Sequence, residues 1–162
     1  MQLTSSLNSL LQFGPLGEFI CTWGSGTTLR NPKGLAVSPV AGEVFVVDGH
    51  RVQAFSTRGD FLYVWGGKKG DAFDKLHSPS ALAFHPSGAE MYVCDEANNR
   101  IIAIDPRPRD ANWRVRQTAL RQWGSHGVGS GQFERPCGVA CSPVSGHIFV
   151  VDAGQSRVQV FL

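Results

Sequence analysis

Short apolar runs separated by polar turns recur along the chain, and no segment keeps a helical period over ten residues. Residues 31–55, 78–105 and 134–161 follow one pattern. Each has a Pro near its start, then an apolar run, a turn of Pro, Ser and Gly, and a β-branched and aromatic run that ends in Asp. A tight polar loop, an Arg and a further apolar run complete the pattern. Such short runs bounded by turn residues predict β-strands.

A fourth run that ends in Trp precedes each pattern, in the segments FICTWG, FLYVWG and LRQWG. We therefore expect each repeat to form a four-stranded antiparallel meander. Such a sheet has two apolar faces and must be sandwiched between copies of itself, as the blades of a β-propeller are. The opening residues Pro32, Pro79 and Pro136 are 47 and then 57 positions apart. The longer spacing predicts an insertion of about ten residues within one blade.

The three copies read NPKGLAVSPVAGEVFVVDGHRVQAF, SPSALAFHPSGAEMYVCDEANNRIIAID and ERPCGVACSPVSGHIFVVDAGQSRVQVF. This signature resembles the NHL repeat family of β-propellers, from about Leu10 to Phe161. The third copy matches most specifically, and the second is looser because IIAID replaces RVQVF. The resemblance implies an all-β fold of four-stranded antiparallel meanders that form a partial arc of a six-bladed ring.

The repeat register predicts the organisation of the chain. We expect residues 1–18 to hold a partial third strand and the lead-in of a preceding blade, 19–60 a first blade, 61–119 a second blade with an insertion at 105–119, and 120–162 a third blade without its outer strand. Three blades and a remnant are too few to close a ring. Either the chain is part of a longer propeller, or two copies complete six blades around a twofold axis by exchanging the N-terminal outer strand.

Composition excludes some classes of protein. The net charge of +2, from 15 basic and 13 acidic residues, is too balanced to indicate a nucleic-acid or membrane surface. No apolar run is long enough to span a membrane, and residues 1–16 do not resemble a signal peptide. Cys137 and Cys141 lack a second ligand pair, so we expect no metal. Free thiols without an export signal favour an intracellular, cytoplasmic location.

Three residue types occur once in every repeat, and we interpret them as structural positions. Each Asp is expected to accept backbone N–H groups in an Asx-type turn of the loop that follows it. Each Arg is expected to pair with this Asp or with a neighbouring blade. Each Trp is expected to pack between blades, with a stacking platform for bases or peptides as the alternative. These residues are Asp48, Asp95, Asp152, Arg51, Arg100, Arg157, Trp23, Trp65 and Trp123.

Two sets of loop residues are candidates for binding. The first lies on the rim shared by the loops that follow the second and the fourth strand of each blade. It is mildly basic and rich in side-chain amides, which suits a peptide or an RNA backbone. This binding rim consists of Arg30, Lys33, His50, Lys68, Lys69, Asn98, Asn99, Arg135 and Gln155.

The second set lies in the insertion 105–119, on the opposite rim. Four arginines surround one tryptophan there, an arrangement that can hold single-stranded nucleic acid or an acidic partner, or form a solvated loop. The set is Arg107, Arg109, Trp113, Arg114 and Arg116.

No nucleophile–base pair, phosphate loop or convergent set of His and carboxylate residues is evident, so we expect a non-catalytic chain with no cofactor. The resemblance implies a protein-binding scaffold, often within ubiquitin-ligase-type assemblies. Single-stranded RNA binding through the basic rim is the alternative, and a metal-dependent lyase or lactonase-like enzyme is the least supported. No RING-type series of Cys and His ligands is present, so a ligase role requires a part or partner outside this chain.

Overall fold

The computed structural model describes residues 2–4, 8–24, 29–107 and 119–162. Within these ranges the chain forms strands β1 to β14 in four antiparallel sheets, with two single-turn 3-10 helices. Sheet 1 contains β1 (Gln2–Thr4), β2 (Ser9–Phe13) and β3 (Phe19–Trp23). Sheet 2 contains β4 (Pro32–Val37), β5 (Val44–Asp48), β6 (Arg51–Phe55) and β7 (Phe61–Gly66). Sheet 3 contains β8 (Ala81–Phe84), β9 (Met91–Asp95), β10 (Arg100–Ile104) and β11 (Ala119–Trp123), and sheet 4 contains β12 (Pro136–Cys141), β13 (Ile148–Asp152) and β14 (Arg157–Phe161). The helices η1 (Glu96–Asn98) and η2 (Ala153–Gln155) follow β9 and β13.

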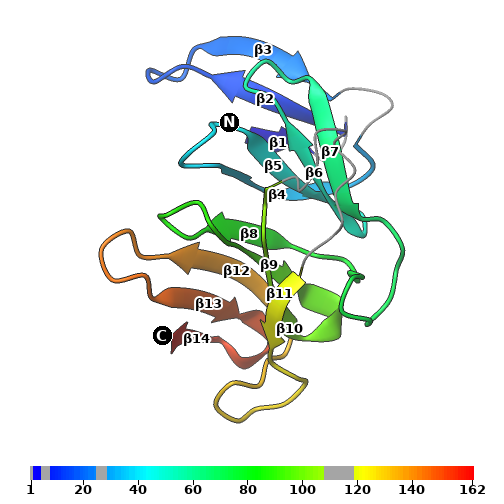
Figure 1. The fold of residues 1–162 in the computed structure, drawn as a ribbon, viewed down its shortest axis with the longest axis vertical. Coiled ribbons are helices and arrows are strands. Elements are labelled where there is room, and N and C mark those ends of the chain that lie inside the picture. The colour runs from blue at the N-terminus through cyan, green and yellow to red at the C-terminus, as the bar shows by residue number, and fades with distance from the viewer. Residues whose placement is uncertain (1, 5–7, 25–28, 108–118) are drawn as a thin grey trace.

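Each sheet is a meander in which neighbours in sequence are neighbours in hydrogen bonding. The sheets follow one another as stacked blades, from sheet 1 in blue to sheet 4 in red (Figure 1). Among the first strands of the sheets, β8 contacts both β4 and β12, so these three strands form the inner edge of the arc. The predicted all-β fold of propeller-type blades is confirmed.

The hydrogen bonds place the sheet boundaries differently from the sequence segments. Strand β3 pairs with β2, and β7 pairs with β6, so the outer strand belongs to the sheet before it. The segments 19–60, 61–119 and 120–162 instead begin on that strand. A repeat has the same period wherever it is cut, and only the hydrogen-bond ladder shows which sheet a strand completes.

Sheet 1 corrects the expectation for residues 1–18. Strand β1 adds a third strand that the sequence pattern did not indicate, because it is short and does not show the repeat signature. Strand β3 is already hydrogen-bonded to β2, so the N-terminal outer strand is not spare. The scheme in which it leaves to complete another copy is therefore in conflict with the observed pairing.

Sheets 2 and 3 each bury two faces because their side chains alternate between the sheet before and the sheet after. In sheet 2, Val44 and Val46 face sheet 1, whereas Phe45 and Val47 face sheet 3. Sheet 3 repeats this arrangement toward sheets 2 and 4. Every residue of β5 and β9 is consequently buried.

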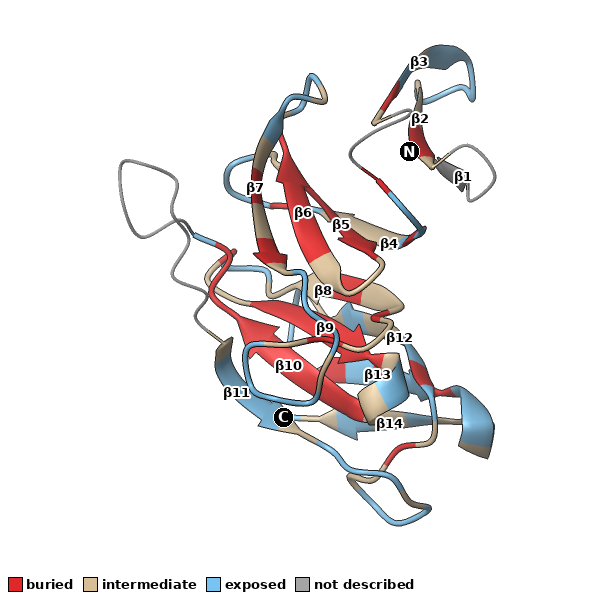
Figure 2. Cartoon of the chain, turned by 90° about the vertical axis from the view of Figure 1, so that its right-hand side faces the viewer, coloured by how far each residue is buried: buried red, intermediate tan, exposed pale blue. Residues whose placement is uncertain are grey.

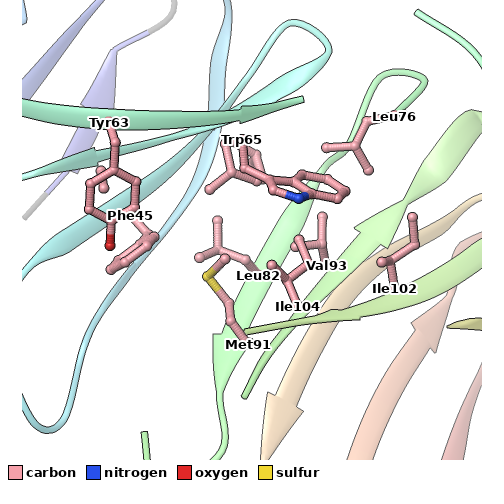
Figure 3. Close-up of a cluster of buried hydrophobic side chains, with 12 residues drawn as sticks. Phe45, Tyr63, Trp65, Leu76, Leu82, Met91, Val93, Ile102 and Ile104 are labelled. Atoms are coloured by element: carbon pink, nitrogen blue, oxygen red, sulfur yellow. The ribbon is translucent and has the colours of Figure 1, made fainter. Parts of the chain in front are cut away.

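Two further side chains fill each junction between sheets. One is the Trp that ends the outer strand, and the other is an apolar residue from the loop that follows it. Between sheets 2 and 3 these are Trp65 and Leu76, which pack over Val93 and Ile102 (Figure 3). The corresponding pairs are Trp23 with Leu29, and Trp123 with Phe133. All three tryptophans therefore contact the apolar clusters between neighbouring sheets.

The outward face of sheet 4 has the same apolar pattern but no sheet against it. Side chains of Phe149, Val151, Val158 and Val160 are 38%, 42%, 58% and 53% exposed. Their counterparts in sheet 2 are Phe45, Val47, Val52 and Ala54, which are at most 2% exposed. Figure 2 shows this change from the buried strands of sheets 2 and 3 to the exposed parts of β13 and β14. We define Phe149, Val151, Val158 and Val160 as the open face.

We expect the purified chain to self-associate through the open face, because apolar patches of this kind drive contacts between proteins. Light scattering over a concentration series should show a mass above that of one chain. The double variant Val158→Asp/Val160→Asp should return it to a monomer. Val144→Asp, in an exposed turn, is the matched control. A soluble monomer at high concentration would contradict this expectation and would leave the remainder of a longer propeller as the partner of this face.

Candidate functional site

The repeated Asp residues lie at the ends of β5, β9 and β13 and are almost fully buried. Asp95 Oδ1 accepts a hydrogen bond from the backbone N–H of His77 at 2.7 Å, and its Oδ2 accepts one from Arg100 Nε at 2.8 Å. The same bonds recur around Asp48 and Asp152. Each Asp therefore holds the loop that precedes its own sheet.

This geometry corrects the expected Asx-type turn. Neither Asp95 nor Asp152 makes a side-chain capping bond to the helix that follows it. The backbone N–H groups that donate to them lie 18 residues earlier in the sequence, in the loop between sheets. The sequence pattern cannot show this, because the loop reaches the carboxylate only after the sheets have stacked.

The paired Arg residues donate hydrogen bonds to backbone carbonyl groups of the same loops. Arg100 donates to the backbone oxygens of Asp71, Ala72 and Lys75 at 2.6–3.1 Å. Arg157 does the same in the next loop, where it donates to the carbonyls of Val128, Gly129 and Gln132 at 2.7–2.9 Å. Because charge-assisted hydrogen bonds from a buried and a partly buried arginine hold these two loops, the backbone of the binding rim is well fixed there.

Several residues of the binding rim are engaged within this framework. Asn98 donates to Asp95 and to the carbonyl of Gly70, and Asn99 accepts from the N–H of Arg135. Gln155 donates to Glu134. These amides stabilise loops, so they are less available to a ligand than the sequence suggested.

Glu96 connects three consecutive sheets across the binding rim. Its carboxylate lies 3.2 Å from Lys33 Nζ of sheet 2 and 3.5 Å from Arg135 Nη2 beside sheet 4. The positive charges of Lys33 and Arg135 are thus partly neutralised by the protein itself. Exposed pairs of this kind contribute little to stability, so their main effect is on the local charge.

His50 lies against His77, with ring centroids 5.8 Å apart, at the junction of sheets 2 and 3. Its Nδ1 accepts a hydrogen bond from the N–H of Ser78 at 3.1 Å. Burial lowers the pKa of His50, and the nearby charges of His77 and Lys69 lower it further, against a smaller opposing effect of Asp95. The neutral ring is therefore the form that this junction accommodates.

The loop between β7 and β8 carries the exposed part of the binding rim. Lys68 and Lys69 are exposed there, and Arg30 is exposed in the preceding loop. The same loop presents Phe73, whose side chain is 44% exposed. The bridges Lys69–Leu76 and His126–Phe133 align this loop with the next one, where Ser130 stands at the position of Phe73. Phe73 is thus not a repeated packing residue.

Sequence reasoning missed Phe73, although one signal for it was present. It is an aromatic residue within a Gly-, Lys- and Asp-rich loop and outside the repeat signature. Aromatic residues are enriched at protein interfaces, and the rim around the buried core of such an interface is polar. Only the structure shows that Leu76, and not Phe73, is the residue that the loop buries.

The second basic set is described only in part. Arg107 is 69% exposed, and its guanidinium group pairs with Asp105 at 2.9 Å. Arg109, Trp113, Arg114 and Arg116 lie outside the described residues. Strand β10 ends at Ile104 and strand β11 begins at Ala119, so the segment between them joins the third and fourth strands of sheet 3.

Two observations on the described ranges concern metal ligands and thiols. No group of three or more His, Cys, Asp or Glu residues there is arranged to hold a metal ion. The four cysteines are free thiols, and burial raises the pKa of Cys94 far above its ordinary value. No described helix is long and apolar enough to cross a membrane.

Comparison with known proteins places the repeats. No protein-family model matches the chain. The chain is 33% identical over 141 residues to human E3 ubiquitin-protein ligase NHLRC1, covering 85% of this chain and 31% of that protein. This chain belongs to the NHL repeat β-propellers. Peptidyl-glycine α-amidating monooxygenase of mouse is 36% identical over 76 residues, and that of Xenopus laevis is 32% identical over 76 residues.

These matches cover only part of each relative, which limits what can be said of this chain from them. Each monooxygenase match covers 43% of this chain and 8% of the enzyme. The chain thus spans less than a third of any of these three relatives. Hydrazine synthase of Kuenenia stuttgartiensis aligns with a TM-score of 0.65 over 90% of this chain and 49% of that chain, at 13% identity. That likeness supports the propeller fold alone.

The Asp–Arg pairs of these NHL repeats should dominate the stability of the loops. Because Arg100 stays buried when its partner is removed, we expect Asp95→Ala to lower the free energy of unfolding by about 3–5 kcal/mol. Urea denaturation followed by Trp fluorescence measures this. Asp60→Ala, at the exposed pair with Arg58, should cost at most about 1 kcal/mol. Equal effects of the two substitutions would contradict the structural role of Asp95.

Stability should also depend on the protonation of His50. A group whose pKa is lower in the folded chain binds fewer protons there, so folding loses free energy as pH falls. We expect the contribution of His50 to the free energy of unfolding to be fully present above its ordinary pKa of 6.5. It should be lost as pH falls through the lower pKa that His50 has in the folded chain. Unfolding free energies measured from neutral to mildly acidic pH should therefore decline less steeply in His50→Asn. The exposed control His126→Asn should keep the slope of the parent, and an unchanged slope in His50→Asn would sink this interpretation.

Proposed function

We propose that the chain is a non-catalytic protein-binding module, and that its contact surface is the β7–β8 loop with the neighbouring exposed cations of the binding rim. The similarity to human E3 ubiquitin-protein ligase NHLRC1 supports a role within a ubiquitin-ligase-type assembly. The catalytic part of such an assembly would lie outside these repeats. The monooxygenase matches are too short to transfer an enzyme activity.

The observation that carries this proposal is the exposure of Phe73 on a loop whose backbone is fixed. Arg100 and Asn98 hold four carbonyl groups of that loop. A rigid loop loses little conformational entropy when it binds, so an exposed aromatic side chain on it is a suitable anchor. The neighbouring lysines add charge that guides a partner and sets its orientation.

Single-stranded RNA is the alternative ligand of this rim, and two features speak against it. Asp71 and Asp74 flank Phe73 and are exposed, and their charge repels a phosphate backbone. The tryptophans considered as stacking platforms are packed between sheets: Trp23 and Trp65 are 8% and 4% exposed, and Trp123 is partly buried between sheets 3 and 4. A mixed-charge loop with one aromatic anchor fits a protein surface better.

The open face of sheet 4 suggests a second type of partner. We propose that a further apolar sheet covers it, supplied by the remainder of a longer propeller or by another copy of the chain. Strand exchange from sheet 1 is not needed for either, since face-to-face stacking alone buries these residues, as it does between sheets 2 and 3.

The rim proposal predicts a selective loss of protein binding. Immobilised chain should retain a defined set of proteins from a cell extract, and Phe73→Ala together with Lys68→Ala and Lys69→Ala should lose that set. Val144→Ala, an exposed residue outside the rim, is the matched control and should retain it. All variants should unfold within about 0.5 kcal/mol of the parent, as surface substitutions do.

Fluorescence polarisation with random single-stranded RNA at two salt concentrations tests the RNA-binding alternative. Tight binding that falls steeply with salt and weakens in Lys68→Ala/Lys69→Ala would identify an RNA reader and overturn the protein-binding proposal. No binding at micromolar protein is the result that we expect.

A further inference from the structure

A hollow of about 270 Å³ lies between sheets 2 and 3, on the rim opposite the binding rim. Its walls come from the β4–β5 loop, the β8–β9 loop and the residues that follow β10. Val40, Ala89 and Pro106 supply apolar surface, and Glu43 supplies a carboxylate. None of these residues belongs to the binding rim, so this hollow is a separate feature.

Sheet 3 contains a carboxylate equivalent to Glu43, with which the hollow can be compared. Glu43 and Glu90 occupy the same repeat position, directly before the second strand of their sheets. Glu90 is satisfied by Arg121, which donates from Nη1 and Nη2 to its two carboxylate oxygens at 2.7 and 2.8 Å. The hydroxyl of Tyr92 donates a further bond at 3.0 Å. This carboxylate therefore has a planar guanidinium partner, the arrangement that the arginine fork favours.

The corresponding arginine is missing beside Glu43. Tyr63 stands two positions before the Trp of its outer strand, as Arg121 does before its own, so a hydroxyl replaces the guanidinium group. The Tyr63 oxygen lies 3.4 Å from Glu43 Oε2 but 2.7 Å from the carbonyl oxygen of Pro106. A hydroxyl has one proton to donate, and the shorter contact takes it.

Glu43 is thus a carboxylate without a strong donor among the described residues. The pKa values of the two carboxyl groups shift in opposite directions. Burial raises the pKa of Glu43, whereas the hydrogen bonds from Arg121 lower the pKa of Glu90. Arg107, which also lines the hollow, does not serve Glu43: its guanidinium group bonds to both oxygens of Asp105 at 2.9 and 3.0 Å.

We propose that the hollow between sheets 2 and 3 binds an arginine side chain of a partner peptide. The guanidinium group would pair with Glu43 as Arg121 pairs with Glu90, and the methylene stem would lie against Val40, Ala89 and Pro106. A guanidinium fork suits this carboxylate better than an ammonium group, because two parallel hydrogen bonds satisfy both oxygens. This site does not depend on the binding rim, and either can fail without the other.

Isothermal titration calorimetry with blocked tripeptides tests the proposal. Acetyl-Ala-Arg-Ala-amide should bind, weakly but measurably at millimolar peptide. The neutral isostere acetyl-Ala-citrulline-Ala-amide should bind at least about tenfold more weakly, since a hydrogen bond to a charged group is worth that much. Acetyl-Ala-Lys-Ala-amide should fall between the two. Equal binding of the arginine and citrulline peptides, or no binding of either, would overturn the proposal.

Two substitutions assign the binding to Glu43. Glu43→Gln keeps the shape of the side chain and should weaken the arginine peptide at least about tenfold. Glu90→Gln is the matched control, because the same change is made where the carboxylate is already paired, and it should leave binding unchanged. The reverse result, or equal effects of both, would overturn the assignment.

A third substitution supplies the missing group from within the chain. Tyr63→Arg reproduces the position of Arg121 and should abolish binding of the arginine peptide by occupying Glu43. If this variant fails to fold, Glu43→Gln still tests whether the peptide binds at Glu43.

The triple variant Arg109→Ala/Arg114→Ala/Arg116→Ala tests whether an arginine of the chain itself competes with the peptide for Glu43. Binding that occurs only in this variant would overturn the assignment to a partner.

Discussion

Every blade of this protein is a sheet with two apolar faces, and it is stable only when another sheet covers each of them. Alternation along β5 sends Val44 and Val46 to one neighbour and Phe45 and Val47 to the other. Burying such a side chain contributes about 1.5–3 kcal/mol, so a junction of a dozen of them exceeds any surface interaction described above. The outer-strand Trp and one loop residue close each junction. The exposure of the open face follows directly from the same rule.

The polar framework depends on this stacking. Asp48, Asp95 and Asp152 are buried because the sheets are stacked, and a buried carboxylate requires donors. The loops between sheets provide N–H groups, and the paired arginines bridge to loop carbonyls. The rim backbone is thereby held in place by groups that repeat, which leaves the residues that do not repeat available for binding. Phe73 is the clearest of these.

Comparison of equivalent positions separates scaffold from function more sharply than chemistry alone. A residue that recurs with the same contacts in each sheet serves the repeat, as the three tryptophans do. A residue that departs from its counterparts needs a separate explanation. Phe73 stands where the next loop has Ser130, and Tyr63 stands where the next sheet has Arg121. Asn98 and Gln155 are candidates for binding because they are amides in loops, but each also donates a hydrogen bond to a carboxylate of its own surroundings, which makes it less available to a ligand.

The amino-acid sequence alone determined the strands of the three repeats, their order and the two-faced character of these sheets, because these follow from local alternation and from turn residues. It also indicated that Asp, Arg and Trp are structural, since each recurs at a constant place. Tertiary structure decided which strand completes which sheet, which donors reach Asp95, and that Leu76 is buried while Phe73 is not. These depend on contacts between residues far apart in the chain, which form only when neighbouring sheets stack, and no local pattern records them.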